Sequence, residues 1–237
     1  DWIRAVCDRH YGIGADGLIR VVRQDGVLFM DYRNADGSVA EMCGNGARVL
    51  ARYLVDDGVT PAGDFDILTR GGIRSVHAPA SGDVSVDMGI AETPRLRAMP
   101  VVSVGGQSWQ ATGVLMPNPH AVVFVDSLDD AGDLLRAPAV APEGVFPDGV
   151  NVEFVVPVSG AHVAMRVFER GVGETLSCGT GACAAAWAAR RREGASPAET
   201  WTVDVPGGRL QVTERSDGHI ILSGPAQIVA RGRIEIA

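Results

Sequence analysis

Two cysteines stand in nearly identical surroundings far apart in the chain. Residues 42–47 read Met-Cys-Gly-Asn-Gly-Ala around Cys43, and residues 177–182 read Ser-Cys-Gly-Thr-Gly-Ala around Cys178. Each motif precedes a segment typical of a helix, over residues 48–55 and 183–192. Unpaired N–H groups and the positive end of the dipole at a helix start stabilise a thiolate, so we expect a lowered thiol pKa. The motifs predict an enzyme with two cysteine acid/base groups.

Glycines in both motifs bring backbone amides close to an anionic ligand, because no side chain stands in the way. The two motifs lie about half the chain apart, as a duplication with insertions would leave them. Two such sites could face one substrate from opposite sides. The simpler alternative is that Cys43 and Cys178 are structural, since a free cysteine often packs as a small apolar residue. The repeated glycine-rich context favours the catalytic interpretation.

Composition limits the class of protein. The chain has 237 residues, 46% of them hydrophobic, so it is long enough for one large domain or two small ones with a substantial core. No segment reaches the roughly 18 apolar residues of a membrane helix. The formal net charge of −8 argues against a nucleic-acid interface. Four cysteines in this length are not a disulfide framework, so we expect a cytoplasmic protein.

The basic residues are all arginine, 21 in number, and the sequence has no lysine. Pyridoxal phosphate is held through a lysine Schiff base, so this cofactor is not expected unless a preceding segment supplies the lysine. We expect such a segment, because the chain starts without Met and already in a helical pattern (Trp2, Ile3, Val6). A P-loop also needs lysine, and no Cys/His quartet has zinc spacing, so the sequence predicts no cofactor and no metal.

Each half of the chain predicts many short strands around one helix with a glycine-rich start. Apolar runs separated by glycine, proline and serine turns predict the strands. In the first half they are expected at residues 27–32, 65–69, 73–77 and 84–88. In the second half they are expected at residues 121–125, 150–156, 163–168, 200–205, 210–214 and 220–223, with a last strand at 228–234. Six alanines within residues 182–189 suit a helix enclosed by a sheet, and alanine also has the highest helix propensity.

Six motifs in order resemble those of the diaminopimelate epimerases, cofactor-independent enzymes that invert one α-carbon of diaminopimelate. The motifs lie at residues 8–17, 34–38, 42–48, 118–120, 148–151 and 169–181. One glycine-rich motif would be weak evidence. Six in order, with two cysteines at duplicated positions, are specific.

The resemblance implies an α/β (α+β) fold of two pseudo-symmetric domains, each a β-barrel-like sheet wrapped around a central helix, with the active site between them. We place the N-terminal domain at residues 1–116 with the last strand, 227–237, and the C-terminal domain at 117–226, because Pro117 and Pro119 interrupt regular structure. The resemblance also implies a homodimer, a role in lysine and peptidoglycan-precursor synthesis, and an N-terminal strand and loop with a substrate-contacting asparagine before Asp1.

The resemblance also implies roles for single residues. Cys43 and Cys178 match the two bases, one thiolate and one thiol, that act on opposite faces of the α-carbon. His120 and Glu169 match residues that flank the reacting centre and help to set the protonation of the cysteines. The residues expected to hold the α-carboxylate through backbone N–H and hydroxyl groups are Gly44, Asn45, Gly179 and Thr180. For the asparagine and the threonine, ordinary helix capping is the alternative.

The second amino-acid centre of diaminopimelate requires contacts of its own. A carboxylate there favours a bidentate arginine, and an ammonium group favours carboxylate or amide oxygens. The residues that match the family at these substrate-binding positions are Asn34, Asn118, Asn151 and Arg170, with Glu169 also close to the substrate. Taken singly, each asparagine also suits a turn, the arginine a surface ion pair, and His120 a buried structural role.

Two alternatives stay open. A proline or hydroxyproline racemase resembles this family in fold and paired cysteines, but its compact ring does not need an arginine and asparagine set for a distal centre. A redox-sensing or ligand-binding protein would use one thiolate as a switch, which leaves the duplicated anion-binding motifs unexplained. Exchange of an α-proton without cofactor distinguishes an enzyme from a sensor.

Overall fold

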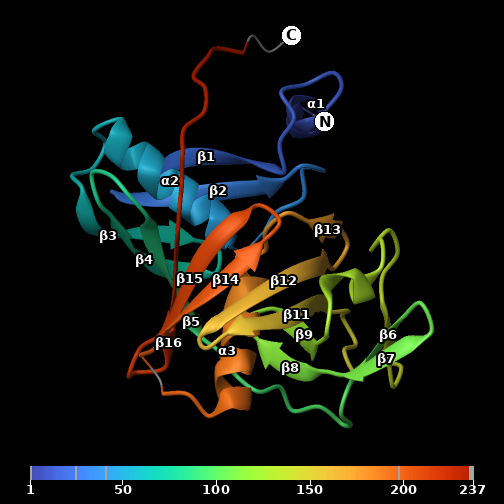
Figure 1. Cartoon of the computed structure of the whole chain (residues 1–237). Helices are drawn as coiled ribbons and strands as arrows, with labels where there is room; N and C mark the ends of the chain where they lie inside the picture. The colour runs from blue at the N-terminus through green and yellow to red at the C-terminus, as the bar shows by residue number, and fades with distance from the viewer. Residues whose placement is uncertain (1, 25, 41, 197, 235–237) are drawn as a thin grey trace. The chain divides into compact units, whose positions relative to one another are not determined.

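The structure is a computed structural model that describes residues 2–24, 26–40, 42–196 and 198–234. The chain divides into two compact units, which we call unit 1 (Asp1–Val86 with Gly224–Ala237) and unit 2 (Asp87–Ser223). Figure 1 labels their helices and strands. The mixture of strands and a few helices confirms the predicted α+β class. Among the helices within the described residues, not one combines the length and apolar character that a membrane span requires.

Unit 1 is a sheet with one long helix packed on it. Its elements are α1 (Trp2–Cys7), β1 (Gly17–Gln24), β2 (Val27–Asn34), α2 (Gly44–Asp56), β3 (Gly63–Thr69), β4 (Gly72–Ala78) and the first part of β5 (Val84–Ile90). The strands run in the order β1-β2-β3-β4-β5, with β2 and β3 parallel and the other neighbours antiparallel. Helix α2 contacts β1, β2 and β4. Its buried Ala47, Leu50, Ala51 and Leu54 recur every three or four residues and therefore form one apolar face.

Unit 2 has more strands and a more deeply buried helix. Its elements are β6 (Val101–Val104), β7 (Gln107–Gln110), β8 (Thr112–Leu115), β9 (Pro119–Phe124), the 3₁₀ helix η1 (Leu128–Ala131), β10 (Ala139–Ala141), β11 (Asn151–Ser159), β12 (His162–Glu169), β13 (Gly173–Thr175), α3 (Gly179–Glu193), β14 (Thr200–Val205), β15 (Gly208–Glu214) and β16 (His219–Gly224). The main sheet has the order β16-β15-β14-β12-β11-β9-β8, with β13 also paired to β12. A smaller sheet has the order β10-β6-β7.

Helix α3 is surrounded by strands, as its alanine content predicts. It contacts β8, β9, β11, β12, β14 and β15, and its six alanines between Ala182 and Ala189 are all buried. The helix ends at Glu193 and is capped by Gly194, whose φ of 65° is the left-handed conformation that favours glycine at a helix C-terminus. Small side chains thus let strands approach α3 from several sides and hold its position.

Most predicted elements are present. The predicted helices lie inside α2 and α3, and both helices begin directly after their cysteine. The strands predicted between residues 27 and 223 correspond to β2–β5, β9, β11, β12 and β14–β16. The sequence does not predict β1, β6, β7, β8, β10 and β13, because their apolar runs are short or mixed with charged and polar residues.

The division of the chain differs from the predicted one. Unit 2 begins at Asp87, whereas the sequence places the boundary at 116/117. Residues 87–116 belong to unit 2 because β8, which they contain, forms an antiparallel ladder with β9. Residues 224–237 group with unit 1.

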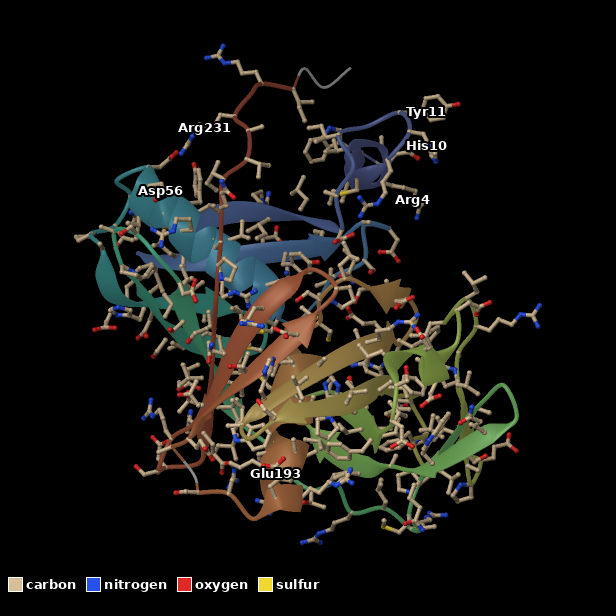
Figure 2. The ribbon with its side chains drawn as sticks, in the orientation of Figure 1. Arg4, His10, Tyr11, Asp56, Glu193 and Arg231 are labelled. Atoms are coloured by element: carbon tan, nitrogen blue, oxygen red, sulfur yellow. The ribbon has the colours of Figure 1, made fainter. Side chains whose placement is uncertain are left out.

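The strand predicted at 228–234 is wrong. The structure assigns no strand there, and Val229 is 89% exposed. Arg231 and Gly232 interrupt the apolar run, and Arg231 instead pairs with Asp57, with Nη1 2.5 Å from Oδ1. Figure 2 shows Arg231 beside the C-terminal end of α2, where Asp56 is labelled. Residues 235–237 of the predicted last segment lie outside the described residues.

Candidate active site

Cys43 and Cys178 occupy the same position in their helices. Each is the N-cap residue with extended backbone, at φ −137° and ψ 113° for Cys43 and φ −113° and ψ 115° for Cys178. The N–H of Gly46 donates to Sγ of Cys43 at 3.3 Å, and the N–H of Gly181 donates to Sγ of Cys178 at 3.4 Å. An N-cap is usually serine, threonine, aspartate or asparagine, whose oxygen accepts this bond. Here a sulfur atom accepts it at the start of both helices.

A side chain at the third residue of each helix would meet a close neighbour. A Cβ atom on Gly46 would lie 2.8 Å from Cε of Met30. A Cβ atom on Gly181 would lie 2.9 Å from Oε1 of Glu153 and 3.3 Å from Sγ of Cys178. The two helix starts thus share a backbone geometry but face different neighbours, a methyl group in unit 1 and a carboxyl group in unit 2.

Cys178 is buried, with 6% of its surface exposed. Burial raises the pKa of its thiol well above the ordinary value, and the nearby carboxyl groups of Glu169 and, to a smaller extent, Glu153 raise it further when they are ionised. The hydroxyl of Thr180, 3.5 Å from Sγ, and the N–H of Gly181 act in the opposite direction. The expectation of a lowered thiol pKa is therefore wrong for Cys178, because burial and two carboxyl groups outweigh the helix start.

Cys43 is partly exposed, and a guanidinium group lies over the first turn of its helix. Arg48, which is buried, donates from Nη2 to Oδ1 of Asn45 at 2.9 Å and from Nη1 to the carbonyl oxygen of Gly44 at 3.5 Å. The side chain of Asn34, at the end of β2, donates from Nδ2 to Oγ of Ser38 at 2.9 Å. At this helix start Arg48 thus contacts neutral groups, the side-chain amide of Asn45 and the carbonyl of Gly44.

The imidazole of His120 lies between two side chains of unit 2. Nδ1 is 2.6 Å from Oε1 of Glu153, and Nε2 is 3.0 Å from Oδ1 of Asn118. The side chains of His120 and Glu153 are both 0% exposed. In the parallel ladder of β9 with β11, His120 pairs with Asn151 and Val122 pairs with Glu153. Side chains alternate between the faces of a strand, so these residues lie on one face of the sheet.

The opposite face of the same strands is apolar. The residues of β9 and β11 that point to this face belong to one buried hydrophobic cluster, which includes Ala121, Val123, Val152 and Phe154. The polar residues of β9 and β11 are thus confined to the face that lies against the first turn of α3, where Glu153 approaches Gly181.

Arg170 is held at the end of β12 by three contacts. Its backbone N–H donates to Oδ1 of Asn151 at 2.8 Å, and its Nη1 donates to the carbonyl oxygen of Asp148 at 2.6 Å. Its side-chain stem lies across Gly149, where a Cβ atom would stand 2.9 Å from Cδ. A cavity of about 250 Å³ lies beside it, lined also by Phe146, Val150 and Phe168 among others. The preceding residue, Glu169, accepts a hydrogen bond from Oγ1 of Thr175.

A family model described as diaminopimelate epimerase matches residues 1–94 and 112–229 of the chain. The chain belongs to the diaminopimelate epimerase family. A diaminopimelate epimerase of Streptomyces coelicolor is 55% identical over 251 residues, which cover 99% of this chain and 86% of that protein. One of Corynebacterium glutamicum is 44% identical over 252 residues, which cover 100% of this chain and 89% of that protein.

Solved structures with the same fold extend beyond the diaminopimelate epimerase family. A protein described as a predicted epimerase of Pseudomonas aeruginosa is 15% identical with a TM-score of 0.73, covering 100% of this chain and 87% of that one. A hydroxyproline epimerase of Agrobacterium vitis is 16% identical with a TM-score of 0.64, and the match covers 93% of this chain and 75% of that one. At these identities the likeness concerns the fold alone.

For this member of the diaminopimelate epimerase family, eight of the predicted site residues lie in unit 2. They are Asn118, His120, Asn151, Glu169, Arg170, Cys178, Gly179 and Thr180. The four in unit 1 are Asn34, Cys43, Gly44 and Asn45. Sequence reasoning missed Glu153. The available signal was a single acidic residue inside the apolar run of β11, where residues 151–155 are all buried. Among the described residues, no group of His, Cys, Asp and Glu is arranged to hold a metal ion.

Proposed function

We propose that the protein interconverts LL- and meso-diaminopimelate by a two-base mechanism that needs no cofactor. The supporting observation is the matched position of two cysteines as N-caps of α2 and α3, in a member of the diaminopimelate epimerase family. Each unit supplies one cysteine. A reaction that removes a proton from one face of a carbon and adds one to the other face needs two such groups.

The proposed step balances as a proton exchange. The thiolate of one cysteine takes the α-proton, so an S–H bond forms as the C–H bond breaks and the electron pair passes into the α-carboxylate. The thiol of the other cysteine gives its proton to the opposite face of the carbon. The centre is inverted, and the two cysteines have exchanged protonation states. The reverse reaction then starts with the thiolate and the thiol interchanged between the two cysteines.

Stabilising the carbanion is the main requirement, because an α-proton is very weakly acidic. In the proposal, the α-carboxylate accepts hydrogen bonds from the first turns of α2 and α3, at Gly44, Asn45 and Gly179, and from the hydroxyl of Thr180. Fixed donors of this kind contribute on the order of 10²–10³ in rate each in a dry site. We assign the resting thiol to Cys178, because burial and the charge of Glu169 raise its pKa.

The remaining predicted residues bind and orient the substrate in this proposal. His120 and Glu169 act beside the reacting carbon and set the protonation of the cysteines. The residues that recognise the distal amino-acid centre are Asn34, Asn118, Asn151 and Arg170. The guanidinium of Arg170 is anchored by one nitrogen to the carbonyl of Asp148, which leaves other N–H groups for a carboxylate.

The biological setting is also a proposal. We infer a cytoplasmic homodimer that acts in lysine and peptidoglycan-precursor synthesis. The four free cysteines suit a reducing compartment, and the family resemblance supports the dimer and the pathway. Light scattering at several protein concentrations measures the oligomeric state; a monomer throughout would contradict the dimer.

Proton NMR in D₂O under reductant tests the activity. LL-diaminopimelate and L-proline are offered separately, without pyridoxal phosphate or metal. We expect deuterium at an α-position of diaminopimelate and appearance of the meso isomer. Exchange with proline alone would assign the protein to the racemase alternative, and exchange with neither would favour the thiol sensor.

A further inference from the structure

Glu153 is an acidic residue whose side chain is 0% exposed. It lies on β11 opposite Val122 of β9 and Val167 of β12, in the interior of the main sheet of unit 2. Oε1 is 2.6 Å from Nδ1 of His120, whereas Oε2 has no hydrogen-bond partner among the described residues. Burying an ionised carboxylate with one oxygen unpaired is costly, so the position needs an explanation.

The neighbours of His120 determine where its protons lie. Nε2 faces Oδ1 of Asn118, an oxygen that can only accept, so Nε2 bears a hydrogen. Nδ1 and Oε1 of Glu153 are close enough that one proton must lie between them. When that proton is on the carboxyl group, Oε2 is a neutral carbonyl oxygen and its lack of a donor costs least. Burial, which outweighs the effect of His120, raises the pKa of Glu153 and favours the same arrangement.

This carboxyl group also lies beside the cysteine of unit 2. Oε1 and Sγ of Cys178 both approach the Cα of Gly181, within 2.9 Å and 3.3 Å of the position a Cβ would take. The ionisable groups that interact with Glu153 here are His120 from β9, Glu169 from β12 and Cys178 before α3. A neutral Glu153 leaves one negative charge fewer beside the sulfur.

We infer that Glu153 is a positioning residue of the active site, whose buried carboxyl group donates to Nδ1 and holds His120 as a neutral imidazole with its proton on Nε2. The effect on turnover rests on the proposed function, but the protonation of His120 does not. Two substitutions separate hydrogen bonding from packing. Glu153→Gln keeps an N–H donor for Nδ1, whereas Glu153→Met fills a similar volume without a donor.

The first measurement is the ¹⁵N chemical shift of the His120 ring nitrogens, assigned by comparison with His120→Gln. We expect an unprotonated Nδ1 and a protonated Nε2 in the wild type and in Glu153→Gln. In Glu153→Met, the form with Nδ1 protonated becomes populated. A wild-type ring with both nitrogens protonated, or with the proton on Nδ1, would overturn the inference.

The second measurement is the kinetics of diaminopimelate epimerisation. Glu153→Met should lower kcat by about 10- to 100-fold with little change in KM, a loss of the size seen when the carboxylate that orients a metal-bound histidine is removed. The loss of kcat in Glu153→Gln should be several-fold smaller than in Glu153→Met. Glu214→Gln is the matched control, a glutamate that pairs with Arg190 near the other end of α3, and should keep the wild-type rate. If Glu153→Met keeps the wild-type kcat and the wild-type ¹⁵N shifts of His120, Glu153 has a packing role only and the inference is wrong. An inactive wild type would refute the proposed function instead, while the shifts still decide the state of His120.

Discussion

The starts of α2 and α3 have the same backbone arrangement and opposite surroundings. Both begin with a cysteine N-cap whose sulfur accepts from the third residue of the helix. In unit 1 the space next to Gly46 is taken by the methyl end of Met30, and Arg48 lies over the first turn. In unit 2 the space next to Gly181 is taken by the carboxyl group of Glu153. A duplicated backbone motif therefore does not give duplicated chemistry.

The difference suits a reaction that needs two unlike protonation states. Burial and the charge of Glu169 raise the pKa of the Cys178 thiol, whereas Cys43 is partly exposed and Arg48 contacts the first turn of its helix. The backbone places both sulfur atoms, and the neighbouring side chains decide which of them holds the proton.

The largest effect is expected for the cysteines themselves. Replacing either Cys43 or Cys178 by serine should lower the epimerisation rate at least about 10³-fold, because a hydroxyl is a far weaker base than a thiolate. Cys183→Ala, inside α3, is the matched control and should keep the wild-type rate. The assay is deuterium incorporation by proton NMR. Normal turnover in either serine variant would remove that cysteine from the mechanism.

Adding one methyl group to each helix start should have unequal effects. In Gly181→Ala the new methyl meets a carboxyl group held by His120, so kcat should fall about tenfold and stability by about 1–3 kcal/mol. In Gly46→Ala it meets the flexible end of Met30, and the gain in helix propensity of about 1 kcal/mol should offset the crowding. Chemical denaturation and steady-state kinetics measure both. Equal losses in the two variants would contradict the proposed difference between the helix starts.

Substrate recognition should depend on unit 2 through Arg170. Arg170→Lys removes the planar pair of donors that a carboxylate prefers, so KM for diaminopimelate should rise about tenfold while the melting temperature stays nearly constant. Arg166→Lys is the control. Arg166 pairs with Glu174 and has no proposed substrate contact, so this variant should keep the wild-type KM. An unchanged KM in Arg170→Lys would exclude a role in recognising the distal carboxylate.

The smallest effect concerns stability and pH, and it contrasts the buried acids of the two units. Hydrogen bonds from Arg70 and Arg33 lower the pKa of Asp31, so its contribution to stability is present above the unfolded value of about 3.9 and is lost as the pH falls through the folded pKa. Asp31→Asn should therefore cost about 1 kcal/mol at pH 7 and less at pH 3.

The contribution of Glu153 to stability depends on pH in the opposite direction. Burial raises its pKa, so its contribution is present below the unfolded value of about 4.3 and is lost as the pH rises through the folded pKa. Relative to the wild type, Glu153→Gln should become more stable between pH 4 and pH 7. Urea unfolding at several pH values measures both variants. A cost of Asp31→Asn that does not change with pH would refute the ion-pair explanation.

The sequence was sufficient to predict the elements that depend on local pattern. The glycine-rich motifs after Cys43 and Cys178 predict helix starts, and alternating apolar residues predict most strands, because both signals lie within a few neighbouring residues. It failed where the outcome depends on contacts distant in the chain. Glu153 matters because β9 brings His120 beside it, and the pKa of Cys178 depends on carboxyl groups from β11 and β12. The apolar run at 228–234 has strand-like composition, but composition does not supply a pairing partner.

The alanines of α3 have a consequence for how this protein can change over evolutionary time. They have no reactive groups, yet six strands contact the helix that they line, and the helix start holds the sulfur of Cys178. Close-packed interiors transmit displacement, so a larger side chain several turns away would shift the reactive atom itself. Some of the residues that restrict substitution in unit 2 are therefore among its chemically simplest.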